Sequence, residues 1–291
     1  MGIEDLFTLK SGRRLAVHTL AEGVSGRTVV LCHAAPGSGL FDPDPEATWA
    51  RGVALISVDR PGYGGSDPVG PGEWSSVERA ADELAEVLVQ LGTGPVGVAG
   101  WSAGGRVALA LAARHPDLVE RVAVVATPAP HEEVPWIPPE QNAGLEALRS
   151  MPPDQVHAAL TQQLAPLATD PAHAVALLGA GPADQAALAA PGARDRLEAM
   201  LRNAFVQGAA GLAADIAGYC LAPWGFEPEQ VEAKTLLVYG AADPVAGPRH
   251  GKWYQRRVPD ARFEQSPGSG HLDIIPRWQR VLSHLAPHSK R

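Results

Sequence analysis

One serine in the first half of the chain has the surroundings of a nucleophile. Residues 95–99 are small or β-branched, and the pentapeptide 100–104, Gly-Trp-Ser-Ala-Gly, follows them before an Ala- and Leu-rich helical pattern. This order predicts a strand, a sharp turn with Ser102 at its apex, and a helix. Gly100 and Gly104 lack the Cβ atoms that would clash in so tight a turn. The turn therefore presents a hydroxyl beside a helix N-terminus.

A serine hydroxyl is a poor nucleophile at neutral pH, so it needs a base and an acid that orients the base. His271 is the candidate base, because it ends the glycine-rich loop 266–271 that follows the last predicted strand. Asp243 is the candidate acid, although an aspartate at that place also suits a helix N-cap. The order serine, aspartate, histidine is the one used with this type of turn. Asp215 is a possible acid that we do not prefer.

The oxyanion that forms during attack needs hydrogen-bond donors, and backbone N–H groups are the expected ones. One is the amide of Ala103, directly after the serine and at the start of its helix. The other comes from the loop 33–37, where Pro36 has no N–H and Ala35 is the best candidate. His33 is interpreted as a structural residue that ties this loop down.

These residues need a scaffold that brings their loops to one edge. Most of the predicted strands are continuous apolar runs, which is typical of strands covered on both faces, and they alternate with loops or helices. The pattern predicts a mainly parallel sheet of about eight strands with helices on both faces, an α/β fold. Strands are expected at 6–9, 14–20, 28–32, 54–58, 95–99, 119–126, 235–239 and 261–264, and helices at 74–91, 104–114, 247–258 and 276–285.

The sequence changes character after residue 128. Residues 129–227 contain many prolines, alanines and leucines in helix-spaced pieces and no convincing strand. We interpret this range as one helical insertion, a cap or lid, between two parts of the core at 1–128 and 228–291.

Composition narrows the class of protein. The 291 residues carry a net charge of −8 with no basic stripe, so no nucleic-acid partner is expected. The N-terminus does not resemble a signal peptide and no apolar run is long enough for a membrane span. Two cysteines, Cys32 and Cys220, do not make a disulfide framework, which favours a cytoplasmic location. The many Ala, Arg, Pro and Gly suit a GC-rich bacterial genome.

Taken together, the segments 33–37, 59–64 and 100–104 with Asp243 and His271 resemble the α/β-hydrolase fold superfamily. The resemblance covers nearly the whole chain except the insertion, which corresponds to the helical cap of that family. It implies a serine hydrolase that cleaves a carboxylic ester or related acyl bond through an acyl-enzyme, without cofactor or metal. The substrate is expected to be a small or medium apolar molecule, and the oligomeric state is not predicted.

Two departures from the family pattern matter. The family usually has His-Gly where this chain has His33-Ala34, which would reshape the oxyanion loop slightly. The loop 33–37 resembles that of proline iminopeptidases, but those enzymes have a Gly-Gly-Ser-Trp-Gly turn that this chain lacks, so an aminopeptidase or amidase is disfavoured. A serine nucleophile argues against haloalkane dehalogenases and epoxide hydrolases.

Other activities remain open at this level. The same fold hosts non-hydrolytic enzymes, such as lyases, perhydrolases and biosynthetic cyclases, and it hosts ligand-binding receptors. Specificity depends on the pocket, for which the sequence offers one proline and four aromatic residues as lining candidates, although core packing suits the aromatic ones equally. These candidates are Trp101, Pro36, Phe41, Trp136 and Trp224.

Overall fold

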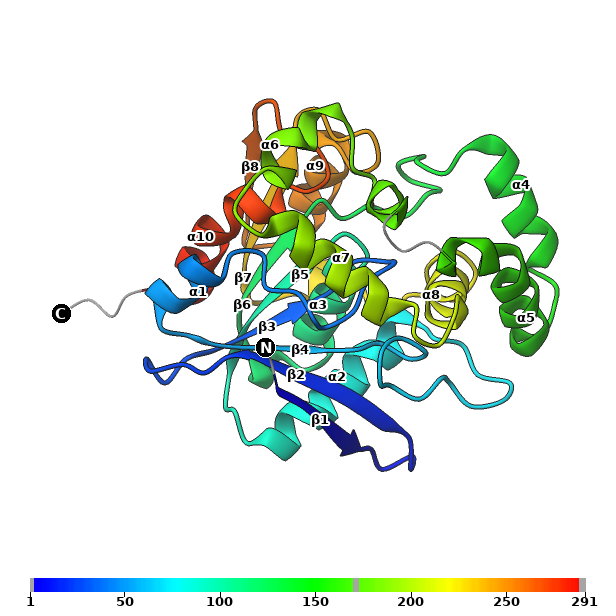
Figure 1. The fold of residues 1–291 in the computed structure, drawn as a ribbon, viewed down its shortest axis with the longest axis horizontal. Helices are drawn as coiled ribbons and strands as arrows, with labels where there is room; N and C mark the ends of the chain where they lie inside the picture. The colour runs from blue at the N-terminus through cyan, green and yellow to red at the C-terminus, as the bar shows by residue number, and fades with distance from the viewer. Residues whose placement is uncertain (1–2, 170–172, 288–291) are drawn as a thin grey trace.

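The structure is a computed structural model that describes residues 3–169 and 173–287. Within these ranges eight strands form a single sheet in the order β1-β2-β4-β3-β5-β6-β7-β8. Figure 1 shows the sheet running through the middle of the molecule from β1 to β8. The strands are β1 (Ile3–Thr8), β2 (Arg14–Ala21), β3 (Thr28–Cys32), β4 (Ala54–Val58), β5 (Val96–Trp101), β6 (Val119–Val125), β7 (Lys234–Gly240) and β8 (Ala261–Ser266).

The sheet is parallel except at one edge. β1 and β2 form an antiparallel hairpin, and β2 pairs antiparallel with β4, whereas all pairs from β4 to β8 are parallel. The central strands are buried on both faces, which explains their continuous apolar sequences. The predicted α/β fold with a mainly parallel eight-stranded sheet is confirmed.

Helices cover both faces of the sheet (Figure 1). On one face α2 (Val77–Leu91), α3 (Gly104–Arg114) and α9 (Pro248–Arg257) bury apolar side chains in a common cluster with β3, β5, β6 and β7. On the other face α10 (Ile274–Leu285) packs on β5 and β6, with α1 (Pro45–Arg51) beside it. A short 3₁₀ turn, η1 (Pro116–Leu118), leads into β6.

Two helices, α2 and α1, depart most clearly from the sequence-based prediction. The helix expected from residue 74 begins at Val77, because Ser76 is its N-cap and accepts a hydrogen bond from the Arg79 N–H. The helix α1 was not predicted from the sequence. It is seven residues long, so its periodicity is weak, but Asp44 caps its first turn and Gly52 ends it in a left-handed conformation.

Between β6 and β7 the described residues contain helices and 3₁₀ turns but no strand. Figure 1 shows α4, α5 and α8 grouped at one side of the molecule, beyond the sheet. All these elements lie inside 129–227, and the division of the chain into core and cap remains a prediction. The elements are α4 (Pro139–Leu148), α5 (Pro153–Leu164), η2 (Ala165–Ala168), η3 (His173–Leu178), η4 (Pro182–Asp184), α6 (Gln185–Leu188), α7 (Ala193–Ala204) and α8 (Ala210–Cys220), with η5 (Pro228–Gln230) just after the range.

Candidate active site

Ser102 lies at the turn between β5 and α3. Its φ is +53°, a left-handed conformation that is strained for a residue with a side chain. The turn is held because the Ser102 N–H donates to Val125 O at 2.9 Å and its carbonyl accepts from the Gly105 N–H at 3.1 Å. The strain is therefore imposed by the strand–helix connection, which leaves the hydroxyl at the strand end.

The glycines around Ser102 leave room for neighbouring backbone. A Cβ on Gly100 would collide with Gly105 in the first turn of α3, in agreement with the crowding expected from the sequence. A Cβ on Gly104 would collide with the carbonyl of Cys32 at the end of β3. Gly104 thus allows α3 to lie close to β3. The glycine is needed for this contact with β3 and not only for the tight turn after β5.

The three residues predicted as a triad lie in hydrogen-bond contact. His271 Nε2 is 2.9 Å from Ser102 Oγ, and His271 Nδ1 is 2.8 Å from Asp243 Oδ2. The other Asp243 oxygen accepts the N–H groups of Val245 and Ala246 at 2.8 and 2.9 Å. Burial favours the neutral carboxyl of Asp243, but His271 and these N–H groups outweigh it and lower its pKa. Asp243 is therefore a carboxylate that fixes the imidazole.

The loop that carries His271 is held by residues that the sequence analysis did not connect with it. The backbone N–H of His271 donates to Asp184 Oδ2 at 3.2 Å, and that of Leu272 donates to Asp184 Oδ1 at 2.8 Å. On the other side, Trp101 Nε1 donates to His271 O at 3.0 Å. A Cβ on Gly270 would collide with the Asp184 carboxylate, so the glycine lets the two segments meet.

Ala35 and Ala103 both line the cavity that Ser102 also lines. Neither amide donates a hydrogen bond to an acceptor in the part of the chain that the structure describes. Ala103 is the N-cap residue of α3, so its N–H also lies at the positive end of a helix dipole. Both amides therefore have no acceptor within the described residues.

Arg60, just after β4, holds the loop that contains Ala35. Its guanidinium donates to His33 O at 2.6 Å and to Ala34 O at 2.9 Å, and its backbone N–H donates to His33 Nε2 at 3.2 Å. Burial, together with the charge of Arg60, holds the pKa of His33 well below its ordinary value. His33 is therefore a neutral, structural residue, as the sequence analysis interpreted it.

Arg60 is in turn paired with Asp215 of α8. Arg60 Nη2 lies 2.6 Å from Asp215 Oδ2, and Nε lies 3.0 Å from Oδ1. Both side chains are almost inaccessible, with 6 % and 2 % of their surface exposed. Asp215 thus stabilises the loop 33–37 through Arg60, from the helical segment, and has no hydrogen bond with His271.

A cavity of about 780 Å³ opens over Ser102 and His271. Of the five pocket candidates, Pro36 and Trp136 line it. Trp101 and Phe41 are fully buried and pack on one another below the site, with ring centroids 5.6 Å apart, and Trp224 stacks on Phe226. Most of the lining is aliphatic, and α4, α5 and α8 contribute part of it, namely Leu145, Leu148, Leu160, Leu164, Leu212 and Ile216.

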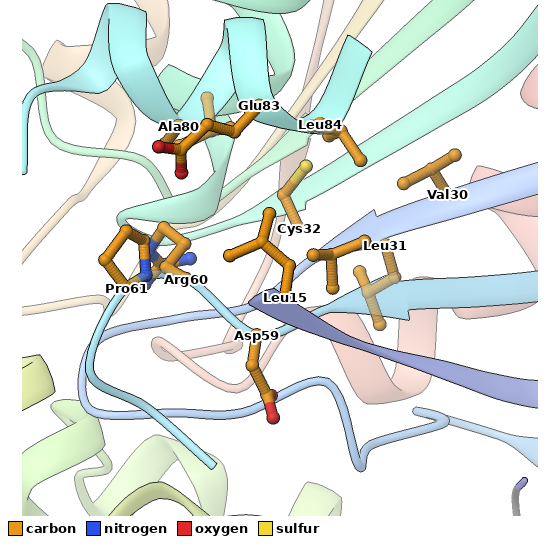
Figure 2. A pocket seen from close by; sticks show the side chains of 12 residues that line it. Leu15, Val30, Leu31, Cys32, Asp59, Arg60, Pro61, Ala80, Glu83 and Leu84 are labelled. Carbon is orange, nitrogen blue, oxygen red and sulfur yellow. The ribbon is translucent and has the colours of Figure 1, made fainter. Parts of the chain in front are cut away.

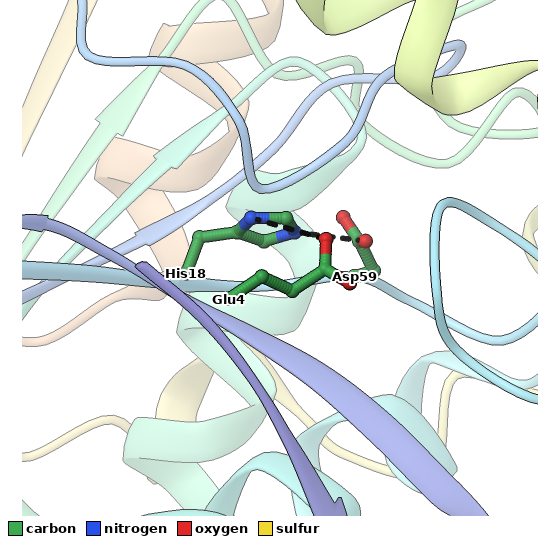
Figure 3. Close-up of side chains that lie close together, drawn as sticks. All are labelled: Glu4, His18 and Asp59. Carbon is green, nitrogen blue, oxygen red and sulfur yellow. Dashed lines mark hydrogen bonds and ion pairs between the residues drawn. The ribbon is translucent and has the colours of Figure 1, made fainter. Parts of the chain in front are cut away.

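A second polar cluster lies away from this cavity. Figure 3 shows the side chains of Glu4, His18 and Asp59 close together. His18 Nε2 is 2.9 Å from Asp59 Oδ2, and the other Asp59 oxygen accepts the Gly39 N–H at 2.5 Å. The ligand atoms of the three side chains lie within 4.8 Å of one another. Because both Asp59 oxygens already accept protein hydrogen bonds, we interpret the cluster as structural and not as a metal site.

Cys32 lies beside a small internal cavity of about 20 Å³ between β3, α2 and Arg60 (Figure 2). Burial raises the pKa of its thiol to about 12, and the charge of Arg60 opposes this only in part. Cys32 is therefore an inert core residue. The two cysteines are not bonded to one another. Among the described helices there is none with the length and apolar character that crossing a membrane would require.

Known proteins resemble this chain along most of its length. Residues 27–277 match the model of the family described as alpha/beta hydrolase fold. A pimeloyl-[acyl-carrier protein] methyl ester esterase from Chromobacterium violaceum is 29% identical, over 94% of this chain and 97% of that protein. A protein of the same name from Aromatoleum aromaticum is 30% identical, over 77% and 82%. A hydrolase structure from Pseudomonas aeruginosa has a TM-score of 0.71 at 23% identity and covers 98% of each chain.

Proposed function

The chain belongs to the alpha/beta hydrolase fold family, and we propose that it cleaves esters of short alcohols with small to medium apolar acids, through an acyl-enzyme on Ser102. That the protein is an ester hydrolase follows from its relatives. The residue roles, the substrate range and the covering of the site by the segment 129–227 are our proposals. The cytoplasmic location stays a prediction.

The observation that carries the residue roles is the 2.9 Å contact between Ser102 Oγ and His271 Nε2 at the base of the cavity. In the first step Ser102 Oγ attacks the ester carbonyl and its proton passes to His271 Nε2. Asp243 stabilises the imidazolium, and the N–H groups of Ala35 and Ala103 donate to the oxyanion. The tetrahedral intermediate collapses when His271 returns the proton to the leaving alcohol.

Water completes the reaction. His271 takes a proton from a water molecule that attacks the acyl-enzyme carbonyl, and a second oxyanion forms at the same two amides. Its collapse breaks the bond to Ser102 Oγ, which regains a proton from His271, and the carboxylic acid leaves. The sum of both steps is ester plus water giving alcohol plus acid.

The cavity supports the proposed substrate range. Its lining is mostly aliphatic, which favours an aliphatic acyl chain over a polar one. The relatives are named for a methyl ester of an acyl group, which supports a short alcohol part. The elements α4, α5 and α8 border the cavity together with Ser102, which supports a cap that closes over the site.

The test has two arms. Treatment with a fluorophosphonate followed by mass spectrometry should find the adduct on Ser102, and a panel of methyl and aryl esters of increasing acyl length should be hydrolysed. Absence of the Ser102 adduct would contradict the nucleophile. Labelling without turnover of any ester would favour a lyase, perhydrolase, cyclase or receptor, and faster cleavage of anilides than of matched esters would favour an amidase.

A further inference from the structure

Arg106, four residues after Ser102, is a buried cation in the wall of the catalytic cavity. We propose that it forms an anion subsite, which binds a carboxylate carried by the acyl part of the substrate. The substrate class is then narrower than in the proposed function: a half-ester that keeps the aliphatic acyl chain next to the ester and carries a free carboxylate at its far end. This rests on the proposed function, because it concerns the acyl side of the same cavity.

The hydrogen bonds of Arg106 leave most of its donors unused. Only 2 % of the residue is exposed, and its Nε and Nη2 both donate to the Pro128 carbonyl, each at 3.2 Å. The Tyr254 hydroxyl donates to the same oxygen at 3.0 Å. A guanidinium has five N–H groups, so one shared carbonyl cannot satisfy it. Apart from this carbonyl and the adjacent Tyr254 hydroxyl, the Arg106 guanidinium has no hydrogen-bond acceptor among residues 3–169 and 173–287.

Arg106 also lacks a counter-ion, which distinguishes it from the buried Arg60. No carboxylate in the described ranges lies within 4.0 Å of its nitrogens. A buried charge is costly unless it is paired. Glu140 of α4 borders the same cavity, but it is exposed and outside ion-pair distance. The nearby His250 is neutral, because burial lowers its pKa to about 4.

Three aromatic rings hold the guanidinium in place. Its central carbon lies 4.7 Å from the ring centroid of Trp224, 4.9 Å from Tyr219 and 5.6 Å from Trp136. The ring faces offset part of the charge but accept no strong hydrogen bond from the guanidinium edge. The result is a rigid cation whose hydrogen-bond donors are oriented before any ligand arrives.

The backbone around Arg106 adds to the positive potential. Arg106 is the third residue of α3, and the first turn of this helix contains no acidic residue. A cation at this end of a helix is opposed by the helix dipole, whereas an anion is favoured by both. A carboxylate fits best, because its two oxygens match the fork of a guanidinium. The aliphatic lining contributed by α4 and α5 suits the chain between the two ends.

The experiment compares monomethyl with dimethyl esters of straight-chain dicarboxylic acids of increasing length. In the wild-type enzyme kcat/KM should favour the monomethyl ester at one chain length by on the order of ten- to a hundred-fold, the range for a charge-assisted hydrogen bond. In Arg106→Met this ratio should fall to about one, whatever the absolute rates, and in Arg106→Lys it should be intermediate.

Arg149→Met is the matched control. Arg149 follows α4 and is paired with Glu146 at 2.9 Å, and it does not border the catalytic cavity. Its loss removes one positive charge from the same region, so the wild-type ratio should persist. A control ratio that falls with that of Arg106→Met would attribute the preference to overall charge and would overturn the subsite.

The remaining outcomes are also decisive. A wild-type enzyme that hydrolyses dimethyl esters and shows no preference for a monomethyl ester overturns the subsite but leaves the proposed function intact. If Arg106→Met lowers kcat/KM equally for monomethyl and dimethyl esters, Arg106 stabilises the oxyanion and does not bind a substrate carboxylate, and the subsite is overturned. If no ester is turned over, protection of Ser102 against the fluorophosphonate by the free dicarboxylates, compared with their dimethyl esters, tests the subsite independently.

Discussion

The Asp184 carboxylate holds the backbone of His271, although the two residues are 87 positions apart in the sequence. Asp184 is 1 % exposed and accepts the N–H groups of His271, Leu272 and Gly181. Hydrogen bonds to an ionised acceptor are about twice as strong as neutral ones. The orientation of the His271 imidazole is thus set from its ring by Asp243 and from its backbone by Asp184.

We predict that Asp184→Asn lowers kcat/KM for a good ester substrate by about tenfold, since such charge-assisted hydrogen bonds contribute ~1.5–3 kcal/mol. The asparagine side chain keeps one oxygen acceptor, but its NH₂ group replaces the other oxygen and faces a backbone N–H that it cannot accept. Steady-state kinetics and the rate of fluorophosphonate labelling of Ser102 should fall together. Asp195→Asn, at an exposed position on α7, is the control, and equal activity of the two variants would contradict the role of Asp184.

The strain at Ser102 predicts a difference between two inactive variants. Ser102→Ala should abolish turnover and leave the melting temperature nearly unchanged, because alanine keeps the left-handed strain. Ser102→Gly should also be inactive but should have a free energy of unfolding about 0.5–1 kcal/mol higher than that of Ser102→Ala, because glycine tolerates a φ of +53°. Urea denaturation measures this difference. A less stable glycine variant would show that the turn is unstrained.

The Arg60–Asp215 pair predicts a large loss of stability when one partner is removed. Asp215→Asn leaves a buried guanidinium without its counter-ion, which should lower the free energy of unfolding by about 3–5 kcal/mol. Glu146→Gln, which breaks the exposed pair with Arg149, should change it far less.

The double variant Arg60→Met/Asp215→Leu separates stability from activity. It should recover part of the stability lost in Asp215→Asn, because no unpaired charge remains buried. Ester turnover should stay low, since the carbonyls of His33 and Ala34 lose the Arg60 donors that hold the oxyanion loop. Full activity of the double variant would show that Arg60 does not position this loop.

The His18 cluster predicts a pH dependence of stability. Burial disfavours the imidazolium most strongly, but the hydrogen bond and charge of Asp59, with the charge of Glu4, outweigh it and raise the pKa of His18. A raised pKa in the folded state stabilises the protein fully below the unfolded value of about 6.5, and this contribution is lost as the pH rises through the folded value.

The free energy of unfolding of the wild type, minus that of His18→Gln, should therefore be larger at about pH 6 than at about pH 8.5. Urea titrations at the two pH values measure it. The subtraction removes the opposite contribution of His250, whose pKa is lowered to about 4 by burial and which destabilises the fold only on the acid side. A difference that grows toward high pH would contradict the predicted protonation.

The raised pKa values of the two cysteine thiols predict that they react slowly in the folded protein. Burial raises the pKa of Cys32 to about 12, and it also raises the pKa of Cys220. Neither thiol should react rapidly with an aromatic disulfide reagent in the native protein at neutral pH, whereas both should react in denaturant. Stoichiometric fast labelling of Cys32 in the native state would show that β3 opens to solvent.

The sequence predicted the fold well where a short segment by itself determines a strand or helix. The apolar runs 28–32 and 54–58 predicted β3 and β4 at their observed bounds, because strands buried on both faces allow few polar residues. The contacts among Ser102, His271 and Asp243 also followed, since loops after parallel strands meet at one sheet edge.

Features that depend on distant pairing could not be predicted. Asp215 was considered only as an alternative acid, because its partner Arg60 is 155 residues away and no local pattern joins them. Asp184 has a local signal, a Gly-Pro-Ala-Asp sequence typical of a helical turn, but its contact with the His271 loop depends on tertiary structure. Trp101 was considered for the pocket, since an aromatic residue beside a nucleophile suits a pocket wall and a support below it equally well.

The two carboxylates from the segment between β6 and β7 hold two different loops that border the cavity at Ser102. Asp215 secures the loop of Ala35 through Arg60, and Asp184 secures the loop of His271. Exchanging this segment between homologous proteins should therefore change more than substrate specificity, because it also removes contacts that hold these two loops. A chimera that imports foreign helices without equivalents of both aspartates would gain a new cavity and lose the catalyst beneath it.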